Sequence, residues 1–107
     1  MDDMPQLGLF DGLADGTIDP IERDFLEFHR TNPAVFRQLV SIAREVKRSG
    51  LDRGSISLVF ETLRYRAITT TGRDYKLNNN HRSRYARLIM DTHLDLAGWF
   101  KVRDLRG

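Results

Sequence analysis

The sequence PAVFRQLVSIAREVKRS, from Pro33 to Ser49, predicts a long amphipathic helix and hence a mainly helical protein. Its apolar residues recur at steps of three and four, the spacing that gives an α-helix one apolar face. These residues are Val35, Phe36, Leu39, Val40, Ile42, Ala43 and Val46. Lys47 and Arg48 suit the negative end of this helix, and Gly50 can take the left-handed conformation that ends it.

Upstream, Asp19-Pro20-Ile21-Glu22 has the pattern of a helix start. An aspartate precedes a proline at the first helical position, and a glutamate follows three residues after the cap, as in a capping box. A first helix is therefore expected from about Pro20 to Arg30. At Asn32-Pro33 the chain should leave the helical region, and Asn32 is expected to cap the next helix.

Downstream, Ser55 or Ser57 can cap a third helix that ends near Ala67. Residues 68–77 then lose the helical period and gain β-branched side chains around Gly72. This change predicts a loop or short hairpin with a strand at Tyr75–Leu77. The apolar stripe of the third helix consists of Ile56, Val59, Phe60 and Leu63.

A fourth helix is expected from about Asn80 to Thr92, because asparagines are good N-caps and three of them occupy positions 78–80. Its inward-facing residues should be Tyr85, Leu88 and Ile89. Within Trp99–Arg103, Phe100 and Val102 alternate with Lys101 and Arg103, which predicts a closing strand. The predicted fold class is mainly α (α+β): a compact helical domain over residues 19–107 with a small β-hairpin, preceded by a flexible arm at residues 1–18.

The composition favours a protein of the cytoplasm. The chain has 107 residues, enough for one domain, and no cysteine, which is typical of a reducing compartment. No apolar run approaches the roughly 20 residues that cross a bilayer, so we expect no membrane contact. Asp2 and Asp3 stand where a secretory signal would carry positive charge.

The charge of the chain is unevenly distributed. Residues 1–24 carry a net charge of −6, and residues 25–107 carry a net charge of +8. Arginine predominates among the basic residues of the body, and its planar fork suits phosphate oxygens, so the body is expected to contact double-stranded DNA. The candidate contacts are Arg53, Arg64, Arg73, Lys76, Asn80, Arg82, Arg84, Arg87, Lys101 and Arg103.

The expected order is helix, helix, short strand, basic helix and strand. It resembles a winged-helix DNA-binding domain, with Trp99–Arg103 in the wing and the Asn80–Thr92 helix in a DNA groove. One departure is the connection of about ten residues before that helix, because a helix-turn-helix turn takes roughly three or four. In an alternative that we rank second, Gly50–Gly54 is the tight turn and the following helix reads the groove through Arg53, Ser57 and Arg64.

Four short motifs lie between residues 28 and 103. They are Phe28-His29-x-x-Asn32-Pro33, Ser55-Ile56 followed by Glu61-x-x-Arg64, Lys76-Leu77-Asn78-Asn79-Asn80, and Tyr85-Ala86-Arg87. Together they resemble small proteins encoded by phages and prophages. These motifs carry no assigned chemistry, so the resemblance implies a phage setting without an activity.

The acidic arm contains the pentapeptide Gln6-Leu7-Gly8-Leu9-Phe10. It resembles the peptide that binds the bacterial sliding clamp, whose pattern is a Gln, a Leu, a small or acidic residue, then Leu-Phe. The resemblance implies that Gln6 makes polar contacts, that Leu9 and Phe10 fill an apolar pocket on the clamp, and that Leu7 is an auxiliary contact. Alternatively, the apolar residues of the arm fold back onto the core of the body.

These features predict a phage-encoded protein that binds the DNA polymerase sliding clamp of its bacterial host and modulates or inhibits replication. The alternative is a winged-helix transcriptional regulator or accessory DNA-binding protein whose arm packs on the body or forms a homodimer. We expect no enzyme, no cofactor and no metal. The acids of the body are scattered, and His29, His81 and His93 lack metal-ligand spacing.

Overall fold

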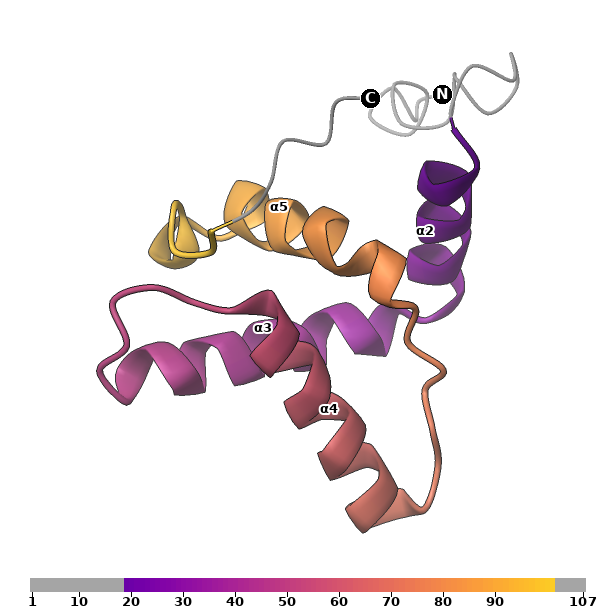
Figure 1. The fold of residues 1–107 in the computed structure, drawn as a ribbon, viewed down its shortest axis with the longest axis horizontal. Helices are drawn as coiled ribbons and strands as arrows, with labels where there is room; N and C mark the ends of the chain where they lie inside the picture. The colour runs from indigo at the N-terminus through magenta and orange to yellow at the C-terminus, as the bar shows by residue number, and fades with distance from the viewer. Residues whose placement is uncertain (1–18, 102–107) are drawn as a thin grey trace, which may run out of the picture.

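The computed structural model describes residues 19–101, which form four α-helices joined by short connections (Figure 1). The α-helices are α2 (Pro20–Thr31), α3 (Pro33–Arg48), α4 (Ile56–Thr71) and α5 (Arg82–Thr92). Two 3-10 turns, η1 (Asn79–His81) and η2 (Leu94–Leu96), flank α5. The mainly helical class is confirmed. Over this range, no helix has the length and apolar character needed to span a bilayer.

The first two helices begin where the sequence predicts. Asp19 caps α2, and its Oδ1 accepts hydrogen bonds from the backbone N–H groups of Ile21 and Glu22. Asn32 behaves differently from the prediction, because its side chain does not cap α3. Its Nδ2 instead donates to the carbonyl oxygen of Phe28 at 3.1 Å, so Asn32 closes the end of α2. Proline at position 33 then starts α3 in a new direction.

Helix α4 is one turn longer than the sequence predicts. Ser55 caps it by accepting a hydrogen bond from the backbone N–H of Leu58, and it continues past Ala67 through the three threonines to Gly72, which has a φ of +74°. The threonine hydroxyls donate back to carbonyl oxygens four residues earlier, which accommodates these β-branched residues in a helix.

The strand predicted at Tyr75–Leu77 is wrong, because residues 73–78 form no strand. Local side chains bind the backbone of this segment. The Oδ1 of Asp74 accepts from the N–H of Lys76, which has a φ of +61°, and Oδ1 of Asn78 accepts from the N–H of Asn80. These Asx turns compete with a ladder for the same backbone groups.

The predicted closing strand is also not formed in the part that the structure describes, residues 99–101. One isolated parallel bridge joins Gly54 to Phe100, and it is the only β-pairing within residues 19–101. Phe100 is 4 % exposed and Lys101 is exposed, as the alternation predicts, but within the described residues the backbone pairing does not extend beyond this single bridge. The predicted hairpin is thus absent from the described part, and Val102 and Arg103 lie outside it.

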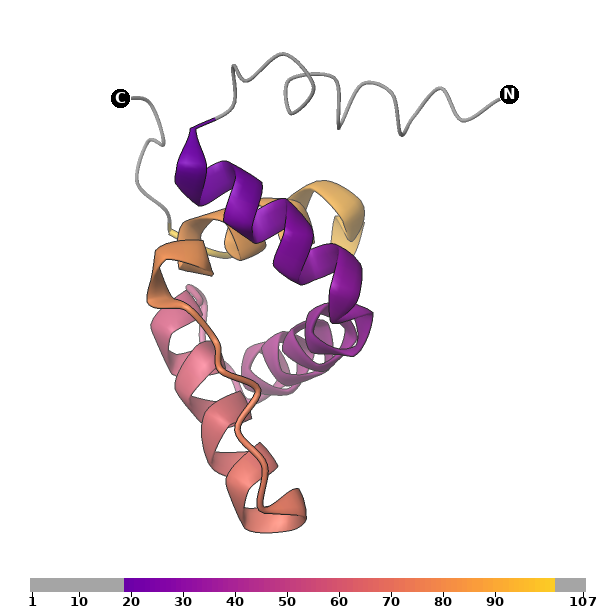
Figure 2. The same cartoon turned by 90° about the vertical axis from the view of Figure 1, so that its right-hand side faces the viewer.

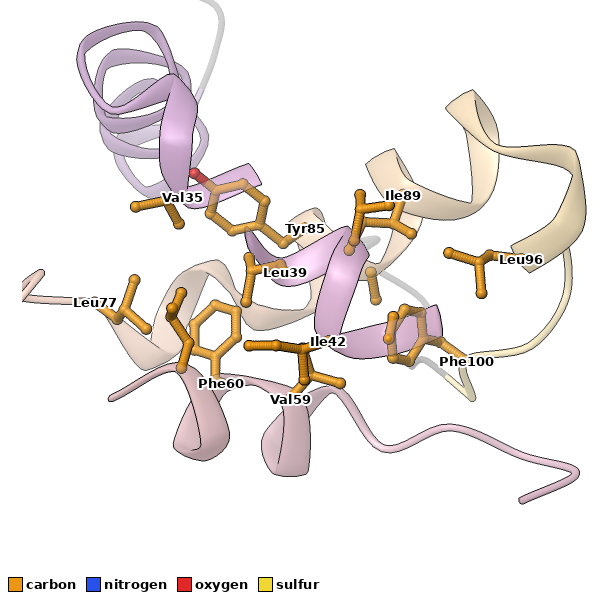
Figure 3. Packing of buried hydrophobic residues seen from close by; sticks show 14 of the residues in the cluster. Val35, Leu39, Ile42, Val59, Phe60, Leu77, Tyr85, Ile89, Leu96 and Phe100 are labelled. Carbon is orange, nitrogen blue, oxygen red and sulfur yellow. The ribbon is translucent and has the colours of Figure 1, made fainter. Parts of the chain in front are cut away.

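The core lies between all four α-helices (Figures 1 and 2), and α5 runs above α3 in the view of Figure 1. Tyr85 and Ile89 of α5 are fully buried and reach the apolar faces of α3 and α4 (Figure 3). Trp99 anchors the C-terminal end of the described chain, because its indole N–H donates to the carbonyl oxygen of Leu51 at 3.0 Å. The other fully buried large residues are Phe60, Leu39, Ile42, Leu96, Val35 and Val59.

Replacing Gly54 with Ala should lower the free energy of unfolding by about 1–3 kcal/mol, the cost of overpacking a filled site. A Cβ at this position would overlap the six-membered ring of the Trp99 indole. Urea unfolding of Gly54→Ala measures the loss. In a Trp99→Leu background the same change should cost much less, and an equal cost in both backgrounds would contradict this packing.

Candidate nucleic-acid interface

Three basic residues surround the N-terminal end of α4, and we call them the basic end: Arg53, Arg82 and Lys101. The N–H of Gly54 donates to the carbonyl oxygen of Trp99 at 2.9 Å. Arg53 and Lys101 each neighbour one of the two residues of the Gly54–Phe100 bridge, so this bridge brings them near each other. Both side chains are exposed. Two segments far apart in the sequence therefore bring positive charge to one end of α4.

Arg82 joins this end from α5. Its Nη1 donates to the hydroxyl of Ser57 in the first turn of α4 at 3.0 Å, and its Nε donates to the carbonyl oxygen of Asn79 at 3.2 Å. Both acceptors are uncharged, so neither offsets the charge of the guanidinium. Arg53 and Lys101 form no ion pair with any other residue in the range 19–101.

The helix dipole adds to this charge. The N-terminus of an α-helix carries a partial positive charge and unpaired N–H groups, which attract anions. The first turn of α4 has no acidic residue, and Asp52 is the one acid between positions 51 and 57. The basic end therefore combines three cations with a helix N-terminus, an arrangement suited to phosphate groups.

Arg64, another predicted DNA contact, is occupied within the protein. It forms an ion pair with Glu61, and its Nη2 donates to the carbonyl oxygen of Leu77 at 3.0 Å and to Oδ1 of Asn79 at 2.7 Å. The side chain is 23 % exposed. Arg64 thus ties the segment that returns from α4 to α5, and this contact orients the turn that precedes Arg82.

Arg84 is bound to acids of α2. Its Nε lies 2.5 Å from Oε1 of Glu22, its Nη2 lies 3.4 Å from Oδ2 of Asp19, and its side chain is only 12 % exposed. Glu22, predicted as part of a capping box, binds this arginine. Arg87 lines the same groove between α2 and α5, whose cavity of about 250 Å³ also borders Leu88.

Helix α5 is mostly covered by its neighbours, and only Asp91 and Thr92 among its residues are exposed. A helix that enters a DNA groove needs an accessible side. Helix α4 has one, because its outer residues Leu58, Tyr65 and Ile68 are all exposed. Of the two helices, α4 therefore has the accessible side that a groove-reading helix would need and α5 does not, in line with the alternative ranked second from the sequence.

The remaining predicted contacts are dispersed. Arg73 and Lys76 are exposed beyond the C-terminal end of α4, and Asn80 is exposed in η1 with its N–H bound to Asn78. The predicted clamp-binding residues Gln6, Leu7, Leu9 and Phe10 lie outside the described residues, as does Arg103.

An aromatic and histidine cluster in the interior was not predicted from the sequence. The ring of Phe25 stacks on His29, with centroids 5.9 Å apart, and meets Tyr85 edge-on at 4.8 Å and His81 at 5.7 Å. The spacing was a signal in the sequence: 25 and 29 on α2, and 81 and 85 across η1 and α5, are pairs four residues apart that share a helix face. His81 is only 3 % exposed.

Burial shifts the protonation of this cluster. Desolvation lowers the pKa of both His29 and His81, because the charged imidazolium is disfavoured away from water. It also raises the pKa of the Tyr85 phenol. Neither ring nitrogen of His81 has a hydrogen-bond partner among the described residues. The cluster therefore favours neutral histidines, and its placement beneath α2 and η1 indicates a packing role.

No protein-family model, curated protein or solved structure matches this chain significantly. Within residues 19–101, no three His, Asp or Glu side chains gather in a way that could hold a metal ion. The functional conclusion therefore depends on the residues of this chain alone.

The free energy of unfolding should fall as the pH is lowered from about 6.5 to about 5. Unfolding returns His29 and His81 to a pKa near 6.5, so the unfolded chain binds more protons than the folded chain in this range. The slope has an upper limit of about 1.4 kcal/mol per pH unit for each histidine. Urea titrations across this range measure it. A His29→Phe and His81→Phe double variant with an unchanged slope would contradict the assignment.

Proposed function

We propose that this chain is a two-part adaptor from a phage or prophage. Residues 6–10 bind the sliding clamp of the bacterial host, and the helical body contacts DNA through the basic end. The observation that supports this division most strongly is that α2, α3, α4 and α5 bury a contiguous apolar cluster of their own. The body has a core built from its own helices, and the pentapeptide precedes its first helix.

The spacing between the two parts suits an adaptor. Phe10 precedes the α2 cap at Asp19 by nine residues. A chain of nine residues spans up to about 30 Å when fully extended. With a connection of this length, the pentapeptide can enter a pocket on a partner protein while the helical body lies beside that partner.

The peptide supplies the groups that a clamp pocket requires. Leu9 and Phe10 offer apolar side chains, Gln6 offers an amide, and Leu7 adds a further apolar contact. Gly8 departs from the favoured serine or aspartate, and its backbone freedom raises the ordering cost on binding. We therefore expect a micromolar dissociation constant, equivalent to about −8 kcal/mol.

The basic end supplies the contact with duplex DNA. Its three cations and the positive end of the α4 dipole match phosphate oxygens, the groups to which most protein–DNA hydrogen bonds go. Such contacts position a protein on DNA without reading sequence. The protein would act in the cytoplasm of the host, either by occupying the partner site of the clamp and blocking the host polymerase or by placing the body on replicating DNA.

A winged-helix regulator is the second candidate. The succession of α3, the connection at residues 49–55 and the exposed α4 favours it, since a helix-turn-helix unit places its second helix in the groove. The β-hairpin that would form the wing is absent from residues 19–101. We therefore rank the adaptor first.

A Leu9→Ala and Phe10→Ala double variant should lose binding to purified bacterial clamp, because both side chains that fill the apolar pocket are removed. Calorimetric titration of the full-length protein with clamp measures the dissociation constant. A Leu13→Ala variant is the matched control outside the pentapeptide. Clamp binding that survives the double change would remove the adaptor proposal.

An Arg53→Ala and Lys101→Ala double variant should bind duplex DNA more weakly and with a smaller salt dependence. Losing two phosphate contacts should reduce the slope of log affinity against log salt by about 1.8. Fluorescence anisotropy at several salt concentrations measures the slope. Arg37→Ala with Arg48→Ala, two exposed arginines of α3, removes the same charge elsewhere. Equal losses in both double variants would show that the basic end is not the contact.

A further inference from the structure

Helix α4 has a second apolar side that faces away from the core. Leu58 is 44 % exposed, Tyr65 is 70 % exposed and Ile68 is 54 % exposed. The buried residues of the same helix, Val59, Phe60, Leu63 and Ala67, lie on its other side. A helix with apolar residues on opposite sides is typical of one that packs against two neighbours. Within residues 19–101, only the inner side of α4 is covered.

The outer side has a regular composition, and we call residues Leu58, Glu61, Tyr65 and Ile68 the α4 stripe. Their positions advance by three, four and three, the spacing of the seam in a two-helix coiled coil. The stripe also reads symmetrically about position 63. Leu58 and Ile68 are both five residues from that position, and Glu61 and Tyr65 are both two residues from it.

We propose that the α4 stripe is the interface of a homodimer in which α4 packs antiparallel against α4 of a second copy. A two-fold axis at the level of position 63 places Leu58 against Ile68 of the partner subunit. It also places the phenol of Tyr65 against the carboxylate of Glu61 of the partner subunit. Each contact occurs twice, as an isologous interface requires.

The chemistry of each pair is complementary. Leu58 and Ile68 are both apolar, and the Tyr65 phenol can donate a hydrogen bond to a carboxylate, which accepts with both oxygens. Oε2 of Glu61 is bound by Arg64 of the same helix, which leaves Oε1 for a second donor. That ion pair also offsets the positive charge of Arg64 beside the stripe.

The residues beside the α4 stripe allow a second helix to approach it closely. Thr62 and Thr69 flank the stripe, and their hydroxyls donate to carbonyl oxygens of Leu58 and Tyr65 within α4. Both hydroxyl groups therefore already have a hydrogen-bond acceptor within α4 when a second helix packs beside them. Figures 1 and 2 both show the C-terminal half of α4 extending beyond the other helices, which gives a second helix access to this side.

A second copy fits the stripe better than an unrelated partner does. Each contact of the stripe finds its complement on the same surface, since Leu58 can meet Ile68 and the Tyr65 phenol can meet Oε1 of Glu61, so a second copy supplies both halves of the interface. The dimer would place the first residues of the two α4 helices about 21 Å apart, at opposite ends of the helix pair. This proposal stands independently of clamp binding, because it uses only residues of α4.

Disulfide trapping tests the antiparallel register directly, because the chain contains no cysteine of its own. A Leu58→Cys and Ile68→Cys double variant should form a covalent dimer under mild oxidation. Tyr65→Cys alone should not, because an antiparallel register separates the two copies of position 65, whereas a parallel one would join them. Leu94→Cys, at a position that is 94 % exposed, reports random collision.

Sedimentation equilibrium provides the second measurement. A Tyr65→Glu variant places like charges opposite each other and should raise the dimer dissociation constant by at least about tenfold. Leu94→Lys is the matched surface control, and circular dichroism checks that both variants fold. The proposal would be overturned by a wild-type protein that stays monomeric at the highest concentration reached, or by trapping of the double cysteine variant no faster than Leu94→Cys.

Discussion

Burial of Tyr85 at the centre of the helices is the contact on which the remaining structure depends. Its ring meets Phe25 of α2 edge-on at 4.8 Å and Phe60 of α4 at 6.0 Å, and it lies near Phe36 of α3. One fully buried side chain of α5 therefore contacts every other helix. The ion pair between Arg84 and Glu22 sits beside this contact at the edge of the groove. With α5 held in this way, the start of the helix brings Arg82 to Ser57 and completes the basic end of α4.

The helices could be predicted from the sequence, because each has an apolar period and α2 and α4 also begin at a capping side chain. The predicted start of α5 is two residues early, because Asn78 caps the preceding turn η1 and the helix begins at Arg82. The hairpin predicted over residues 68–77 was wrong, and the threonines at positions 69–71 show why. Their β-branched side chains favour a strand in isolation, yet their hydroxyls bind the preceding turn and α4 continues to Gly72. The basic residues can be listed from the sequence as candidate contacts, but their partners in the fold depend on groups distant in sequence. No local signal shows that Arg84 meets Glu22, 62 positions earlier, or that Arg64 binds Leu77 before η1 and Asn79 within it.

Three segments of the chain are suited to different tasks. The pentapeptide precedes α2, the basic end occupies the start of α4, and the α4 stripe runs along the outer side of the same helix. DNA contact through Arg53, Arg82 and Lys101 uses none of the stripe residues, so it is compatible with clamp binding and self-association. Insertion of α4 into a DNA groove would instead compete with the dimer for Leu58, Tyr65 and Ile68. Two copies in one particle would also present two pentapeptides, and linking two weak sites raises the apparent affinity when both can engage. A micromolar peptide would then suffice for a stable complex.

The central claim is that the protein meets the clamp through the segment before α2, and residue-resolved NMR of the isotope-labelled full-length chain tests it most directly. On addition of unlabelled bacterial clamp, the amide signals of residues 6–10 should shift or broaden first and in proportion to the clamp added. Signals from the core residues of α3 and α5 should keep their positions. Perturbations confined to the helical body, or a spectrum that does not respond to the clamp, would contradict the account.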